Sequence, residues 1–267
     1  MPDADEKTVL QLGELNVEGR LRAASNTTLL CTATLDGVSV RCVYKPRKGE
    51  RPLWDFPSGT LGYREVATFD LAVAMGWDLI PTTLWREDAP LGPGMCQAWR
   101  DAGERDPVEV LPAVEVPHGW RVVAEGEGTE GASVCLAHED SDDLRKLALF
   151  DLIVNNTDRK GGHILRDESG RLAGIDHGLT FHVEDKVRTV LWGWAGEEIT
   201  GEERDALERL RHGPAADAES LVEAAPGLAR LSRLEVRSAL ERLDQVLAAG
   251  AYPVPYGGWP ALPWPAM

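Results

Sequence analysis

The chain has 267 residues and a formal net charge of −16, with 43% hydrophobic and 27% charged residues. This length suits one large domain or two small lobes with a sizeable core, and the composition excludes wholesale disorder. The strong acidity, without any run of Lys or Arg, argues against partners such as nucleic acid and anionic membranes. The acidic N-terminal residues lack the apolar region of a secretory signal, and no apolar stretch is long enough for a transmembrane helix, so we expect a cytoplasmic protein.

Four cysteines occur, which are too few for a disulfide scaffold, and none of them belongs to a Cys-x-x-Cys pair. Cys31 and Cys42 lie among apolar residues. Buried thiols in a reducing compartment are therefore expected.

The first 60 residues or so have the pattern of β-structure. Residues 29–35 and 38–44 are rich in apolar and β-branched side chains, which favours two strands. Asp36 and Gly37 between them are a strong signal for a hairpin turn. An earlier strand is expected near residues 10–17.

A helix is predicted over residues 63–75, with Gly76 as its stop. Two further strands are expected over residues 79–85 and 94–100, and the prolines of this region favour edge or irregular strands. The first half is thus predicted to be a sheet that carries one helix.

The second half is predicted to be mostly helical. A helix over residues 144–154 follows Ser141, a candidate N-terminal cap. Capping boxes begin at Thr200 and Ser232, and the helix after Ser232 is expected to end at Gly250.

Two other segments have unusual compositions. Residues 101–143 contain twelve acidic residues and two basic ones, which predicts a solvated acidic face rather than a site. Residues 252–267 carry no charge and contain five prolines. We expect this segment to pack back on the body, and partner binding is the alternative.

The strongest local signal for chemistry lies in two short segments. Residues 155–165 contain Asp158, with His163 five positions later, and residues 174–181 place Asp176 in an Asp-x-Gly turn after an apolar strand. Phosphoryl transfer needs one carboxylate to orient the attacking hydroxyl. It also needs a second carboxylate and one more ligand to hold Mg²⁺ against the triphosphate.

Two upstream residues fit the same chemistry. Lys45 ends the predicted hairpin and Glu65 lies at the start of the predicted helix. A strand lysine that is held by a helix glutamate can bind the α- and β-phosphates of ATP. A lone strand lysine is usually a surface residue, but four such elements in this order rarely arise by chance.

These segments resemble motifs of the phosphatidylinositol 3/4-kinase-like superfamily, within the wider protein-kinase-like fold. The likeness is nearest to type II phosphatidylinositol 4-kinases and uncharacterised bacterial relatives. It rests on Asn-Thr-Asp-Arg at residues 156–159, on Ile-Asp-His-Gly-Leu-Thr-Phe at residues 175–181 and, more weakly, on Arg-Glu-Val-Ala at residues 64–67. The resemblance covers roughly residues 15–200.

The resemblance implies a role for each site residue. Asp158 would be the catalytic base or would orient the hydroxyl, and Asp176 would bind Mg²⁺ together with His163. The residues implied to bind ATP are Ser25, Asn26 and Thr27 in a loop over the phosphates, Lys45 with Glu65 holding it, and Gln97 and Trp99 in the hinge between the lobes.

The sequence departs from the superfamily in three respects. His163 occupies a position where the family has Asn, and since imidazole suits softer ions, Mn²⁺ is an alternative to Mg²⁺. There is no Gly-x-Gly-x-x-Gly loop, and the basic, hydrophobic membrane surface of the lipid kinases has no counterpart.

The expected fold is therefore an α+β, two-lobed, protein-kinase-like fold. The N-lobe would span residues 1–99, the C-lobe residues 100–251 and a tail residues 252–267. The expected activity is ATP-dependent phosphoryl transfer to a hydroxyl of a protein or small molecule. The alternatives are a nucleotide-binding pseudokinase or scaffold, and the same fold with AMP-transfer chemistry.

Overall fold

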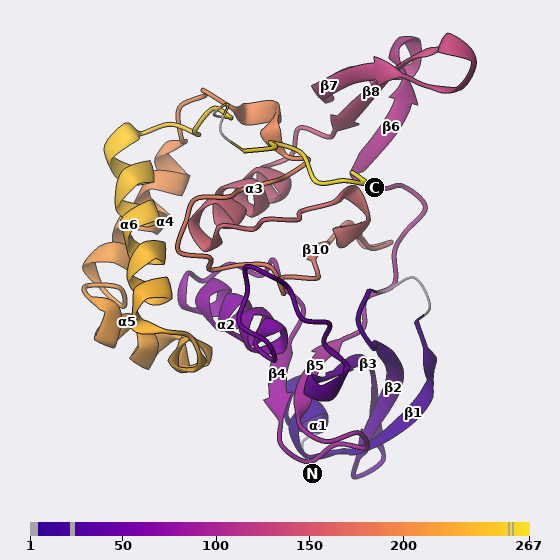
Figure 1. Ribbon diagram of the computed structural model, residues 1–267, viewed down its shortest axis with the longest axis vertical. Coiled ribbons are helices and arrows are strands. Elements are labelled where there is room, and N and C mark those ends of the chain that lie inside the picture. The colour runs from indigo at the N-terminus through magenta and orange to yellow at the C-terminus, as the bar shows by residue number, and fades with distance from the viewer. Residues whose placement is uncertain (1–4, 22–24, 256, 258) are drawn as a thin grey trace.

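The computed structural model describes residues 5–21, 25–255, 257 and 259–267 of the chain. Figure 1 shows a β-rich N-terminal lobe and a larger, mostly helical C-terminal lobe. The predicted α+β fold with two lobes is confirmed by this order of elements. No helix within the described ranges is both long and apolar enough to cross a membrane.

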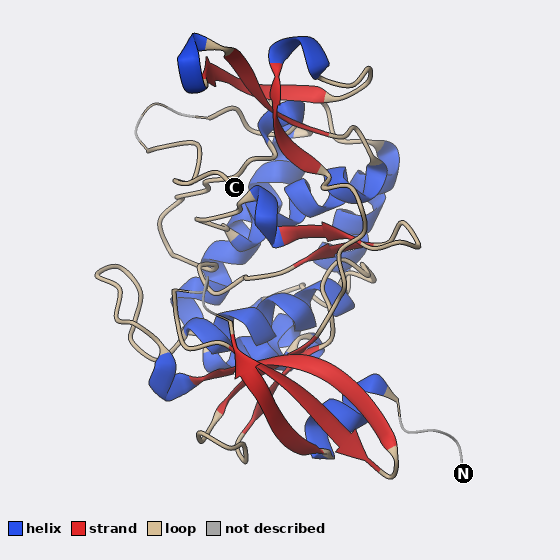
Figure 2. Ribbon diagram, turned by 90° about the vertical axis from the view of Figure 1, so that its right-hand side faces the viewer, coloured by secondary structure: helices blue, strands red, loops and turns tan. Residues whose placement is uncertain are grey.

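An antiparallel sheet of five strands forms the N-lobe, in the order β1-β2-β3-β5-β4 (Figure 2). The predicted hairpin is confirmed, because Leu35 pairs with Val38 across a turn in which Asp36 and Gly37 both have positive φ. The strands are β1 (Glu14–Arg20), β2 (Leu29–Leu35), β3 (Val38–Pro46), β4 (Thr83–Arg86) and β5 (Gly94–Ala98).

The expected strand over residues 10–17 is wrong in its first part, because helix α1 (Glu6–Leu12) occupies it. The Asp5 carboxylate caps this helix by accepting a hydrogen bond from the Thr8 amide at 2.7 Å. Its two fully buried residues, Val9 and Leu10, pack into the core of the N-lobe sheet. Burial of this short apolar stretch thus stabilises a helix where the sequence indicated a strand.

Helix α2 (Leu61–Ala74) confirms the predicted helix and lies between the lobes. The Glu50 carboxylate accepts hydrogen bonds from the first two amides of the helix, those of Leu61 and Gly62. An acidic group at this end also complements the helix dipole. Leu71, on the opposite face, packs into the main C-lobe core, so α2 contacts both lobes.

The acidic segment holds a structure that the sequence did not predict. Residues 108–138 form a three-stranded antiparallel sheet that projects from the C-lobe, instead of belonging to a mostly helical half (Figure 1). The side chains of Glu115, Glu125 and Glu127 are exposed, as expected of a solvated face, while Cys135, Leu136 and Ala137 of the central strand are buried. The strands are β6 (Val108–Pro112), β7 (Arg121–Glu127) and β8 (Ser133–His138).

The helices of the C-lobe follow the capping signals closely. Capping boxes begin at Thr200 and Ser232 as predicted, and Gly250 ends the last helix in the left-handed conformation. Ser141 is the N-cap residue of α3, as expected, although its side chain contacts the Glu139 and Asp143 carboxylates and makes no capping hydrogen bond. The elements are α3 (Asp142–Val154), α4 (Gly201–His212), α5 (Ala218–Ala224) and α6 (Arg233–Ala249), with a small hairpin of β9 (Ile164–Arg166) and β10 (Leu172–Gly174).

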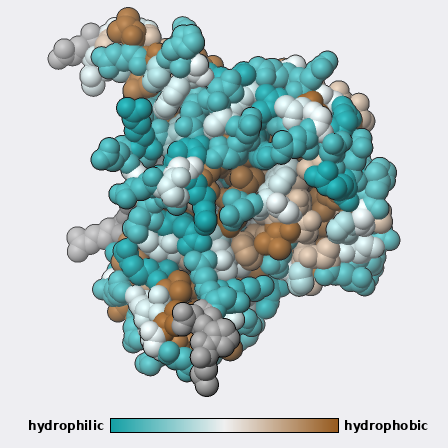
Figure 3. Space-filling view, turned by 180° about the vertical axis from the view of Figure 1, so that it is seen from behind, coloured by the Kyte–Doolittle hydropathy of each residue, from teal (hydrophilic) through white to brown (hydrophobic). Residues whose placement is uncertain are grey.

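Two further expectations are confirmed. All four cysteines are free and buried. The described part of the C-terminal segment packs back on the body, since Tyr252 is buried in the main core and both Leu262 and Ala266 contact it. The back of the molecule is mostly hydrophilic, with an apolar region near its middle (Figure 3).

Candidate active site

Lys45 lies at the centre of a charge cluster where three distant segments meet. Its Nζ atom is 2.8 Å from Glu65 Oε1 and 2.9 Å from Asp176 Oδ1. Strand β3 supplies the lysine, helix α2 the glutamate and the loop after β10 the aspartate. The predicted contact between Lys45 and Glu65 is confirmed. The Glu65 side chain is only 3% exposed whereas that of Asp176 is 49% exposed, so the cluster opens to solvent on the Asp176 side.

The charges in this cluster change one another's protonation. Burial opposes the charge of Lys45, but the Asp176 and Glu65 carboxylates outweigh it and raise the pKa of the ammonium. Lys45, in turn, lowers the pKa of Asp176 below its usual range. Burial raises the pKa of Glu65 to about 7, although Lys45 opposes this shift. The cluster therefore presents a charged lysine and a charged Asp176 at neutral pH.

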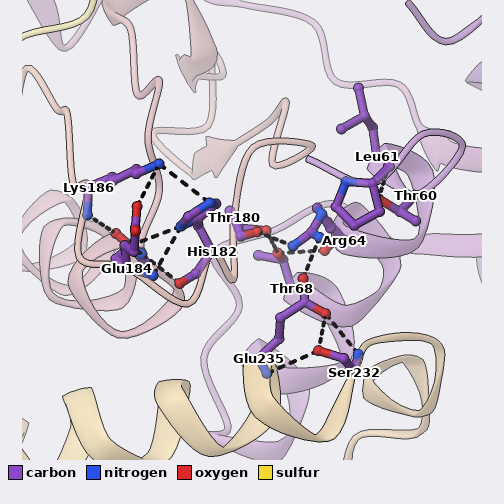
Figure 4. A network of polar contacts seen from close by, with 12 residues as sticks. Thr60, Leu61, Arg64, Thr68, Thr180, His182, Glu184, Lys186, Ser232 and Glu235 are labelled. Carbon is purple, nitrogen blue, oxygen red and sulfur yellow. Dashed lines mark hydrogen bonds and ion pairs between the residues drawn. The ribbon is translucent and has the colours of Figure 1, made fainter. Parts of the chain in front are cut away.

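Arg64, next to Glu65, holds helix α2 against the C-lobe (Figure 4). Its side chain is 1% exposed, and its guanidinium donates to the Thr180 carbonyl oxygen at 2.6 Å and to the Glu235 carboxylate. Glu235 belongs to the capping box of α6 and Thr180 to the segment that follows Asp176. A buried ion pair thus fixes the position from which Glu65 reaches Lys45.

His163 and Asp176 face one another, as predicted for a shared ion. His163 Nε2 is 3.4 Å from Asp176 Oδ2, while the buried Nδ1 atom has no hydrogen-bond partner. Burial lowers the pKa of His163 despite the nearby Asp176, so the imidazole is neutral at pH 7. Asp176 has a positive φ of 56°, a strained conformation of the kind that clusters at functional sites.

These two side chains fit a divalent cation. A carboxylate oxygen and a neutral imidazole nitrogen that face each other are a donor set for Mn²⁺, and less so for Mg²⁺, which prefers oxygen. Within the described parts of the chain, no group of three or more His, Cys, Asp or Glu residues is arranged to hold a metal ion.

Asp158 lies in the turn that follows α3, and its side chain is 24% exposed. Its carboxylate is 3.1 Å from Lys160 Nζ, and its backbone amide donates to the Asn156 side chain at 3.1 Å. Asn156 is itself buried and bound to Asp151. The buried Asn156 thus anchors the loop, and the Asp158 carboxylate remains accessible to solvent.

Arg159 is the residue that sequence reasoning missed. It is fully buried, and its guanidinium pairs with both oxygens of Asp151 on α3, at 2.7 and 3.0 Å. It also donates to the carbonyl oxygens of His163 and Ile175 and to the ring of His177. One side chain therefore joins the loop of Asp158 to the loop of Asp176. The only sequence signal for it is its place next to Asp158 in the motif.

The expected phosphate-covering loop is tied to a neighbouring turn. The Asn26 side chain accepts a hydrogen bond from the Arg51 amide at 2.8 Å, and the Thr27 amide donates to the Gly49 carbonyl at 3.1 Å. Ser25 is exposed at the start of this loop. No described contact brings Ser25, Asn26 or Thr27 to Lys45 or Asp176.

The two residues of the expected hinge make contacts within the N-lobe. Gln97 is 5% exposed, and its side-chain amide donates to the Thr83 hydroxyl at 2.8 Å inside the sheet. The Trp99 amide donates to the Arg41 carbonyl at 2.9 Å, and the Trp99 ring lies under the Arg41 guanidinium. The side chain of Gln97 and the amide of Trp99 are thus already engaged in the N-lobe.

Comparison with known proteins identifies a relative in sequence and a similar solved structure. No protein-family model matches the chain. The chain is 44% identical over 275 residues to Protein Rv2133c of Mycobacterium tuberculosis, which covers 98% of this chain and 96% of that protein. The structure is also similar to a crystal structure of the Helicobacter pylori proinflammatory kinase CtkA, with a TM-score of 0.44 and 12% identity over 91% of this chain and 94% of that chain.

Proposed function

We propose that this chain, which belongs to the same family as Protein Rv2133c of Mycobacterium tuberculosis, is an ATP-dependent kinase. It would transfer the γ-phosphoryl group of ATP to a hydroxyl of a protein or small molecule. The observation that carries the proposal is the contact of Lys45 with both Glu65 and Asp176, which lie 20 and 131 positions further along the chain. A lysine held in this way beside a half-exposed carboxylate suits a triphosphate and its cation.

Each group would act through its own chemistry. The charged Lys45 would bind the α- and β-phosphates, and the buried Glu65 would keep it in place. The Asp158 carboxylate would accept the hydrogen bond of the acceptor hydroxyl and orient it toward the γ-phosphate. Lys160 Nζ, 3.1 Å from the Asp158 carboxylate, lies close enough to meet a transferred phosphoryl group.

Asp176 and His163 would hold a divalent ion, Mg²⁺ or Mn²⁺. When bound, the ion would neutralise charge on the β- and γ-phosphates. The neutral imidazole of His163 favours Mn²⁺ over Mg²⁺, so the two ions are expected to support transfer to different extents. The acidity of the chain favours a protein or small-molecule acceptor over a lipid surface.

The direct test is incubation of the purified protein with γ-labelled or α-labelled ATP, in Mg²⁺ and in Mn²⁺, with a broad acceptor panel. Label transferred from the γ position alone supports the kinase. Label from the α position indicates AMP transfer instead. Nucleotide binding without any transfer indicates a pseudokinase and contradicts the proposal.

Asp158→Asn separates the enzyme from a binding protein. We expect nucleotide affinity and melting temperature to stay nearly unchanged, because the one ion pair of this side chain among the described residues is a partly exposed one with Lys160. Phosphoryl transfer should fall by at least about 100-fold, since a positioned base contributes about 10²–10⁴-fold. Asp88→Asn, at an exposed position of the N-lobe, is the matched control and should be neutral. Unchanged transfer in Asp158→Asn would exclude a catalytic role for this residue.

A further inference from the structure

The segment of residues 259–267 runs along the candidate catalytic loop. The Gly161 amide, three residues after Asp158, donates to the Ala266 carbonyl at 2.8 Å. The Thr189 amide donates to the Ala261 carbonyl at 3.0 Å, and the Trp192 ring nitrogen donates to the same oxygen at 2.8 Å. The segment thus accepts hydrogen bonds from two separate loops of the C-lobe.

Those two loops lie side by side around Asp158. The Arg159 amide donates to the Arg188 carbonyl at 3.0 Å, and the Val190 amide donates to the Arg159 carbonyl at 3.1 Å. Residues 261–266 connect the outer ends of this pair, one at Thr189 and the other at Gly161. In Figure 1 the yellow trace of the segment crosses the front of the C-lobe toward β6 and β10. An acceptor that approaches Asp158 would meet the segment at this side.

Packing makes the segment a close-fitting part of the C-lobe. A Cβ atom on the buried Gly161 would lie 2.5 Å from Met267 Sδ, so a larger residue at this position would have to displace the end of that flexible side chain. Leu262 packs against the main core. The Trp259 ring lies 5.1 Å from Lys186 Nζ, at cation–π distance. Removing the segment would leave the Gly161 and Thr189 amides without these partners.

We infer that residues 259–267 form the acceptor-side wall of the active site and position the loop that carries Asp158. The inference rests on the proposed function, because it assigns the segment to the acceptor of that reaction. The hydrogen bonds to two loops and the packing of Leu262 against the core favour a fixed wall over a removable plug. A wall supports transfer when it is in place, whereas a plug blocks it.

Leu262→Asp tests the wall, because it introduces a charge on the side of the segment that packs against the core. Val114→Asp adds the same charge outside the segment, at an apolar side chain that is 95% exposed, and it serves as the matched control. The readouts are phosphoryl transfer, binding of a non-hydrolysable ATP analogue, and hydrogen exchange at the Gly161 and Thr189 amides. We expect Leu262→Asp to speed exchange at both amides and to lower transfer by about tenfold or more, with analogue affinity within about twofold. Val114→Asp should match the wild type.

A second pair of variants approaches the contact from the loop. Gly161→Ala places a methyl group against Met267, whereas Gly162→Ala has no atom within 4 Å of its new Cβ. We expect transfer to fall in Gly161→Ala alone, and to recover when Met267→Ala is added to make room. This pair also decides the question if Leu262→Asp fails to fold, and recovery in the double variant would not follow from a general loss of stability.

The outcomes are distinct. Faster transfer on release of the segment would identify a plug and overturn the inference, and so would unchanged transfer despite faster amide exchange. If the wild-type protein transfers no phosphoryl group, the proposed function is refuted, and the inference about the wall fails together with it. If the wild-type protein is active and each variant behaves like its matched control, only the inference about the wall is refuted.

Discussion

Lys45 lies between two carboxylates with different surroundings. Glu65 is buried and its pKa is raised to about 7, so its charged form depends on the lysine. Asp176 is half-exposed and its pKa is lowered, mainly by Lys45, so it stays charged and can also meet a cation. A single lysine therefore supports a buried structural contact and a solvent-facing functional one.

Lys45→Met should separate the contribution of Lys45 to nucleotide binding from its contribution to stability. We expect ATP affinity to fall by about tenfold or more, because the phosphates lose a charge-assisted partner. The melting temperature should also fall, since Glu65 is left buried without a cation. Adding Glu65→Gln removes the unpaired charge, so it should restore part of the stability and none of the binding. Calorimetric titration and thermal unfolding measure the two effects. Wild-type affinity in Lys45→Met would contradict its role.

His163→Asn tests the candidate metal ligand. An amide oxygen suits Mg²⁺ better than an imidazole does, so we expect transfer with Mg²⁺ to be kept or increased relative to transfer with Mn²⁺. His163→Ala removes the ligand and should weaken the dependence on both ions. The measurement is transfer rate against metal concentration. Loss of activity in His163→Asn, together with full activity in His163→Ala, would show that His163 is not a ligand.

Helix α2 is the element on which the site depends most. Arg64 ties it to Thr180 and to Glu235, and the Asp70 carboxylate accepts a hydrogen bond from the Gly227 amide at 2.7 Å. These contacts join the helix to the C-lobe along its length. A helix held at several points cannot move away from Lys45 without breaking a buried ion pair. The geometry thus favours a permanently assembled contact between Lys45 and Glu65.

Helix α3 supports the two functional loops through Asp151. Asp151→Asn would leave the fully buried Arg159 without its charge partner, which typically costs about 3–5 kcal/mol of unfolding free energy. Asp244→Asn is the control. It breaks a surface pair with Arg211 at 2.6 Å, in which Asp244 is 49% exposed, and should cost at most about 1 kcal/mol. Denaturant unfolding measures both values, and equal effects would contradict the central position of Arg159.

Two buried histidines set how the stability of the whole molecule responds to acid. The His138 ring accepts a hydrogen bond from the Gly193 amide, and the His177 ring accepts one from Arg159. The accepting nitrogen of each ring must therefore carry no proton. Burial lowers the pKa of His138 below its ordinary 6.5, and burial with the Arg159 charge lowers the pKa of His177 further. Protonation would break both hydrogen bonds.

We therefore expect the protein to lose stability as the pH falls below 6.5. The unfolded chain takes up protons at this pH, whereas folded His138 and His177 do not. Melting temperatures between about pH 8 and pH 5 measure the effect. His138→Gln should reduce the slope, and His118→Gln, at an exposed position, should leave it unchanged. Because the raised pKa of Glu65 acts in the opposite direction over this range, the contradicting result is a slope that His138→Gln leaves unchanged.

Local chemistry allowed the sequence by itself to determine many parts of the protein. The Asp36–Gly37 hairpin, the two capping boxes and the stop at Gly250 follow from backbone preferences that need no tertiary contact. The motifs around Asp158 and Asp176 indicated a kinase-like site because their spacing is local. Lys45 and Glu65 could be added because their order along the chain matches the same chemistry.

Only the tertiary structure decided the rest, because burial depends on residues far apart in the chain. Helix α1 forms where packing against the N-lobe sheet overrides a strand-like pattern, and the sheet of residues 108–138 forms within an acidic segment whose composition gave no such sign. The ion pair of Arg159 with Asp151 spans eight positions but is important because it is fully buried beside the Asp176 loop. The contact of Gly161 with Ala266 joins loops over a hundred positions apart. Such contacts have no local signature, since the free energy that selects them comes from excluding water when the whole chain folds.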